Sequence, residues 1–256
     1  MVRVVSAVAA NTVRELVRSK LLYNLLLFAV LFIAASLFVA QLTIGNWNRV
    51  ILDMGLATIE IAGVLVAVLI GVGIVAGEIE RKTIFPTLAK PVPRSAFLLG
   101  RYAGLVAILA VNVAVMLAVL AIVLRLAGYA VSPTTAEATL LLFLELAVMA
   151  AVAVFFASFT TPMLATAFAL SVFLIGHLLG DLRAFGDRSK SAAARVLSHA
   201  IYQVLPDLEL LNLKSYASNE LSVQTRFVWT SVGYGCAYAA VLLMLAIFIF
   251  QRRDLK

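Results

Sequence analysis

The sequence predicts an all-α membrane protein whose chain crosses the bilayer six times. Hydrophobic residues make up 64% of the 256 residues, and the mean hydropathy is +1.08. Charged residues make up only 13%, about half the share that is usual in soluble domains. These charges lie mainly between long apolar runs. The composition therefore excludes an ordinary water-soluble enzyme.

Six apolar runs are long enough to be transmembrane helices. A helix needs about 20 residues to cross roughly 30 Å of hydrocarbon, where lipid offers no hydrogen-bond partner to the backbone. The fourth and fifth runs are separated by only five residues that end at Pro162. One continuous helix there would exceed the bilayer, so we expect a tight hairpin. The runs are 21–42, 58–76, 102–124, 140–157, 163–179 and 228–250.

The distribution of lysine and arginine predicts the orientation, because positively charged loops tend to stay in the cytoplasm. Residues 1–20, the second connection and the C-terminal tail carry twelve of them, against two in the short loops on the other side. Six more in residues 180–227 leave the balance unchanged. Both termini are therefore expected in the cytoplasm. Topology explains the net charge of +7, so no nucleic-acid partner is expected.

Two segments outside the runs have structure of their own in this interpretation. Residues 1–20 alternate apolar and basic positions as an amphipathic helix lying in the cytoplasmic interface would. The alternative is a simple extension of the first crossing. Residues 180–227 exceed the usual loop length and predict a structured outer segment, with a helix over 191–205. The leucines of 208–213 are expected to pack on protein.

The connection 77–101 has the chemistry of a protein-docking segment. Acids are followed at once by bases, and three prolines then favour an extended stretch. A stop-transfer boundary is the alternative, but it explains neither the acids nor the length. The docking residues are predicted to be Glu78, Ile79, Glu80, Arg81, Lys82 and Thr83.

Three ionisable residues, apart from tyrosine and cysteine, lie inside the predicted crossings: Glu60, Glu145 and His177. Buried charges are costly in hydrocarbon, so such residues usually face partners or a cavity. We predict that they form part of a pathway or gate in the outer half of the membrane. Glu60 and His177, each third from the outer end of its run, could instead reach water, whereas Glu145 lies deeper.

Motifs of catalysis are absent from the sequence. There is no phosphate-binding loop, no HExxH, no GxSxG and no pair of cysteines. The two histidines are too far apart in sequence to suggest a metal site. No catalytic residue, metal or cofactor is therefore expected in this chain. Glycine pairs at four-residue spacing, such as Gly73 with Gly77 and Gly100 with Gly104, permit close helix contacts.

The second connection resembles that of permease subunits of type 2 ATP-binding-cassette (ABC) transporters. The matching features are Gly77 to Thr83, then Pro91-Val92-Pro93-Arg94, then Gly100-Arg101 before the third crossing. The amphipathic start, the hairpin near Pro162 and the outer leucine-rich segment extend the resemblance along the chain. Lys82 departs from the glycine that is common before the threonine.

The resemblance implies a non-catalytic permease domain over residues 1–256 that exports a substrate across a cell membrane, the bacterial inner membrane in this family. It implies a separate ABC ATPase, which binds ATP and Mg²⁺ and contacts the docking residues on a coupling helix. It also implies a second permease subunit, a homodimer being preferred to a heterodimer. The alternative is an ion-coupled secondary transporter, or another stand-alone membrane protein, with Glu145 as the coupling carboxylate.

Overall fold

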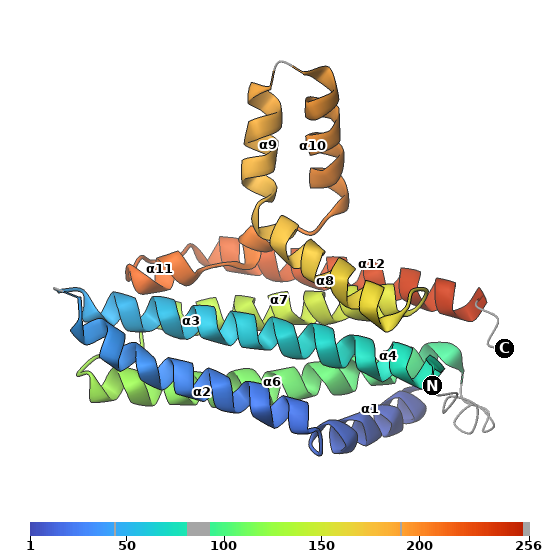
Figure 1. Cartoon of the computed structure of the whole chain (residues 1–256), viewed down its shortest axis with the longest axis horizontal. Coiled ribbons are helices and arrows are strands. Elements are labelled where there is room, and N and C mark those ends of the chain that lie inside the picture. Colours follow the sequence, from blue (N-terminus) through green and yellow to red (C-terminus); the bar gives the residue numbers. More distant parts are fainter. Residues whose placement is uncertain (44, 81–92, 190, 253–256) are drawn as a thin grey trace.

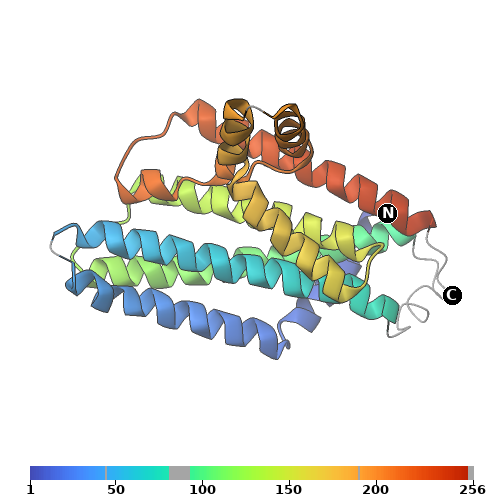
Figure 2. The same cartoon turned by 45° about the horizontal axis from the view of Figure 1, so that its top comes forward.

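The computed structural model describes residues 1–43, 45–80, 93–189 and 191–252, and within these ranges all regular structure is helical. The all-α class is confirmed. Among the described residues, five helical spans are long and apolar enough to cross a membrane. They lie side by side in one bundle (Figures 1 and 2). The spans are α2 (Lys20–Gln41), the run Trp47–Val75, α6 (Arg94–Leu126), α7 (Pro133–Ala157) and α12 (Thr225–Arg252).

The fifth predicted crossing is a bent pair of helices rather than a straight one. α8 (Pro162–His177) begins directly after the predicted hairpin, which is confirmed. Its 16 residues reach only about 24 Å, less than the bilayer core. A bend of 63° separates it from α9 (Leu179–Arg188), where the sequence turns polar. With this pair counted as one span, six spans of the described residues are long and apolar enough to cross a membrane, the number that the sequence predicts.

The second crossing combines three consecutive helical elements. α3 (Trp47–Leu65) leads into a π-helical stretch, η1 (Val66–Ile70), and then into α4 (Gly71–Glu80). A π-helical stretch inside an α-helix often marks a functional position. It follows directly on the part of α3 that carries Glu60.

The start of α3 was predicted wrongly, eleven residues too late at position 58. Arg49 and Asp53 lower the hydropathy there, but they lie one helical turn apart and form an ion pair of 3.7 Å. Ile51 and Leu52 are buried on the same helix. Glu60 is consequently the fourteenth residue of α3 rather than a residue close to its end.

The first helix packs on the beginning of α6. α1 (Val2–Leu16) matches the amphipathic helix predicted within residues 1–20, and Thr12 and Leu16 are buried. Gly104 of α6 allows the close approach, since a Cβ at this position would lie 2.6 Å from Cβ of Thr12. Of the glycines at four-residue spacing, Gly104 thus makes a close helix contact, whereas no atom lies within 4 Å of the Cβ position at Gly73. α1 and the end of α12 lie at the same end of the bundle (Figure 1).

The segment before the last crossing leaves the bundle and then returns to it. α9 and α10 (Ala192–Val204) form a hairpin that projects sideways (Figures 1 and 2), and α10 confirms the helix predicted over 191–205. The short helices η2 (Leu208–Leu211) and α11 (Lys214–Ser218) bring the chain back. Leu208, Leu211 and Leu213 are buried, so this part packs on protein as expected.

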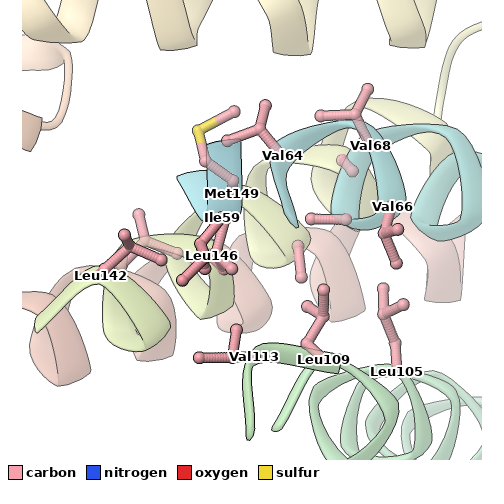
Figure 3. Packing of buried hydrophobic residues seen from close by; sticks show 14 of the residues in the cluster. Ile59, Val64, Val66, Val68, Leu105, Leu109, Val113, Leu142, Leu146 and Met149 are labelled. Atoms are coloured by element: carbon pink, nitrogen blue, oxygen red, sulfur yellow. The ribbon is translucent and has the colours of Figure 1, made fainter. Parts of the chain in front are cut away.

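The hydrophobic core lies where α3, η1, α6 and α7 meet. Figure 3 shows branched aliphatic side chains and one methionine from these elements pointing toward one another. Gly63 brings α3 close to α7, because a Cβ there would collide with Cδ1 of Leu146. This contact lies beside Glu60 and Glu145 in sequence, and it sets how closely their two helices approach. The labelled core residues are Ile59, Val64, Val66, Val68, Leu105, Leu109, Val113, Leu142, Leu146 and Met149.

Candidate functional site

Three of the predicted site residues meet inside the bundle, although each comes from a different helix. Nε2 of His177 on α8 lies 3.0 Å from Oε1 of Glu60 on α3. The same nitrogen lies 3.5 Å from Oε1 of Glu145 on α7. One ligand atom from each of the three side chains lies within 4.8 Å of the others. The structure thus brings Glu60, Glu145 and His177 into one cluster.

Both acids are almost inaccessible to water. The side chain of Glu60 is 5% exposed and that of Glu145 is 2% exposed. Glu60 is the fourteenth residue of α3 and Glu145 the thirteenth of α7, so each lies about 20 Å from the start of its helix. Neither acid can be stabilised by bulk water at this depth. Their charges therefore depend on neighbouring side chains.

Lys214 is the fourth member of the cluster, and the sequence analysis missed it. Nζ of Lys214 forms an ion pair with Oε2 of Glu60. The sequence showed this lysine only as one of six cations in residues 180–227. The available signal was its position directly after the apolar leucines of 208–213, which predict a return to the bundle.

The position of Lys214 is fixed by contacts between the preceding segment and α12. The backbone N–H of Asp207 donates a hydrogen bond to Oη of Tyr234, at 2.8 Å. The hydroxyl of Tyr238 donates to the carbonyl of Val204, at 2.9 Å. Burial raises the pKa of the Asp207 carboxyl above its ordinary value. Leu208 and Leu211 then anchor the chain before Lys214.

The ring of His177 is held in a defined orientation. Its Nδ1 lies 3.1 Å from the carbonyl oxygen of Phe173, one turn earlier on α8. The two rings also pack edge to face, with centroids 4.8 Å apart. A carbonyl can only accept, so Nδ1 must carry the proton of this hydrogen bond. The other ring nitrogen, Nε2, is the one that lies beside the two acids.

The predicted docking residues lie at the end of α4 and beyond it. Glu78, Ile79 and Glu80 belong to the last turn of that helix. Arg81, Lys82 and Thr83 lie outside the described residues. The docking role stays a prediction.

Two arginines of the family-like motifs join helices at the start of α6. Nη1 of Arg94 donates to the carbonyl oxygens of Phe250 and Gln251 at the end of α12, at 3.2 and 3.1 Å. Nη1 of Arg101 lies 2.6 Å from Oε2 of Glu15 on α1. Cations at helix ends satisfy the last carbonyl groups. These residues give the Pro-x-x-Arg and Gly-Arg features a structural role.

Comparison with known proteins gives one clear result. Residues 6–255 match the family described as ABC-2 family transporter protein. A search of curated proteins finds no significant match. The matched region covers nearly the whole chain. Membership of the chain in this family agrees with its bundle of apolar helices. The chain therefore belongs to the ABC-2 transporter family and is a multi-pass membrane subunit of an ABC transporter.

Proposed function

We propose that this chain is the permease of an ATP-driven exporter and that a separate ATPase subunit drives it. The observation that carries the proposal is the family match over residues 6–255. The match favours this function over the ion-coupled secondary transporter, which would need no ATPase. The permease itself has no catalytic role in this proposal. ATP and Mg²⁺ are bound by the partner.

The ATPase contacts the permease at residues 78–83. Helix α4 ends at Glu80, at the same end of the bundle as α1 and the end of α12 (Figure 1). The excess of lysine and arginine predicts that this end is cytoplasmic, where ATP is available. Two permease copies, preferably identical, and two ATPase subunits form the transporter. It lies in a cell membrane with both permease termini in the cytoplasm.

The cluster of Glu60, Glu145 and His177 lies on the pathway or its gate in this proposal. It joins α3, α7 and α8, and so any relative movement of these helices must change the contacts among its side chains. A low-dielectric interior makes such a change energetically large. ATP-driven rearrangement of the two bundles could therefore be coupled to this cluster.

Charge reversal at the docking segment tests the proposed ATPase contact. We expect Glu78→Lys combined with Glu80→Lys to abolish co-purification of the co-expressed ATPase subunit and to reduce transport at least about tenfold, because each change reverses a charge in the proposed contact. Membrane insertion should be unchanged. The control is Glu137→Lys combined with Asp181→Lys, which makes the same charge change on α7 and α9. Equal ATPase recovery with both double variants would contradict the docking role.

A further inference from the structure

We propose that Glu60, Glu145 and His177 bind one divalent transition-metal ion, and that Zn²⁺ matches the site best. The sequence predicts no metal site, since the histidines lack the spacing of a metal motif. The inference goes beyond the proposed transport function and does not depend on the ATPase. It rests on the geometry of three side chains from α3, α7 and α8.

The first step concerns the protonation of His177. The hydrogen bond to the carbonyl of Phe173 places a proton on Nδ1. A neutral histidine carries only one ring proton, so Nε2 then presents a lone pair. This nitrogen lies 3.0 Å from Oε1 of Glu60 and 3.5 Å from Oε1 of Glu145. Three electron-rich atoms therefore face one another.

The second step is that these three atoms need a cation between them. Oε1 of Glu60, Oε1 of Glu145 and Nε2 of His177 are all buried, and none has a hydrogen-bond partner of acceptable geometry among the described residues. A second proton on Nε2 would also relieve the repulsion, by forming an ion pair with Glu60 at 3.0 Å, and metal binding by the purified protein distinguishes the two cases. A metal ion accepts all three donors at once. Unpaired buried polar atoms are otherwise costly.

The third step is the fit of the distances and the ligand types. Donors around a tetrahedral Zn²⁺ with bonds of about 2.1 Å lie roughly 3.4 Å apart. The His177 nitrogen lies 3.0 and 3.5 Å from the two carboxylate oxygens, close to that value, and the ligand atoms of the three residues lie within 4.8 Å of one another. Imidazole nitrogen suits Zn²⁺, whereas Mg²⁺ and Ca²⁺ prefer an all-oxygen set. Three protein ligands leave the fourth position open to water or another ligand.

The fourth step is the support behind the ligands. Metal-binding histidines usually donate their other N–H to a carbonyl or carboxylate, as Nδ1 of His177 does. Lys214 contacts Oε2 of Glu60, the oxygen that the metal does not need, and it orients this carboxylate. The positive charge of Lys214 opposes the metal. Its side chain is 22% exposed, so water partly screens that charge.

Metal content of the purified chain tests the proposal. The protein is purified in detergent with a tag that contains no histidine, incubated with Zn²⁺ and freed of unbound metal. We expect about one Zn²⁺ per wild-type chain and at least tenfold weaker binding by Glu145→Gln and by His177→Gln, since each change removes a ligand. The control is His199→Gln, which removes an exposed histidine 2.9 Å from Asp187 on the hairpin. This variant should bind Zn²⁺ as the wild type does.

Two further readouts keep the test decisive if a variant does not fold. Co²⁺ in place of Zn²⁺ should give the visible absorption of a four-coordinate site in the wild type. Zn²⁺ should raise the Tm of the wild type, and a chelator should lower it again. Equal Zn²⁺ content in the wild type and His177→Gln, or no Zn²⁺ and no rise in Tm of the wild type, would overturn the metal site. If the wild type binds no Zn²⁺ and its Tm does not rise, a proton rather than a metal ion lies between the three side chains.

Discussion

Two charged sites among the described residues of this bundle differ in their access to water. At the start of α6, Arg101 donates to Glu15 of α1, whose side chain is 53% exposed. In the cluster, His177 and Lys214 meet Glu60 and Glu145, whose side chains are 5% and 2% exposed. Water can stabilise Glu15 if its partner moves away, whereas Glu60 and Glu145 depend on the neighbouring side chains of His177 and Lys214.

This difference separates a structural contact from a functional one. An ion pair with access to water contributes little to stability and fastens two helices at a small cost. A buried cluster with unpaired acceptor atoms costs free energy, and it persists when packing holds its members together. Gly63 and Leu146 provide that packing between α3 and α7. The cluster is therefore the better candidate for a role in function.

The largest fall in Tm is expected when the cation beside Glu60 is removed. Lys214→Met leaves a carboxylate buried without its ion-pair partner, and such losses cost about 3 kcal/mol or more. In the presence of a chelator, we expect the Tm to fall by roughly 10 °C for a chain of this size. Thermal unfolding of the detergent-purified protein, followed by tryptophan fluorescence, measures the change.

The double variant Lys214→Met with Glu60→Gln is the matched control. It removes both charges, so it should recover much of the Tm that the single variant loses. A fall in Tm that is the same for the single and double variants would show that the ion pair does not stabilise the fold. The comparison of the two sites would then lose its basis.

A smaller effect is expected where α1 meets α6. Gly104→Leu places a side chain where a Cβ alone would lie 2.8 Å from the carbonyl oxygen of Ala9. Overpacking of this kind costs about 2 kcal/mol, and α1 should detach first. The control is Gly73→Leu, since no atom lies within 4 Å of the Cβ position at Gly73. Protease sensitivity of α1 and the Tm distinguish the two variants. Equal results would disprove the close contact.

The smallest effect is expected for the ion pair with access to water. Arg101→Gln removes a charge-assisted hydrogen bond to Glu15, which water can replace on the carboxylate, and a weaker one of 3.3 Å to Oγ1 of Thr12. We expect a loss of about 1 kcal/mol. The same thermal assay should therefore give a clearly smaller fall in Tm than Lys214→Met gives. A larger fall would reverse the ranking of the two sites.

Much of the fold could be predicted from the sequence, because it follows from local properties. Apolar runs of sufficient length located the crossings, and Pro162 marked the hairpin between α7 and α8. Local hydropathy failed at the start of α3, where Arg49 and Asp53 pair on the helix surface. It also missed the bend after His177, because the run stayed apolar through Leu179.

The candidate site was only partly predictable for a different reason. Glu60, Glu145 and His177 were recognisable one by one, since an ionisable residue in an apolar run is unusual. Lys214 carries no such signal, because it lies in a polar segment far from Glu60 in sequence. Only the return of the chain through η2 and α11 brings it to the acid.

The sequence by itself determined the class, the family resemblance and the approximate crossings, because hydropathy, charge and motifs are properties of neighbouring residues. The tertiary structure decided that two acids, a histidine and a lysine from four helices meet at one buried point. Their meeting depends on how α3, α7 and α8 rotate and approach one another. Close packing at Gly63 and Leu146 sets that approach between α3 and α7, and no local pattern records it.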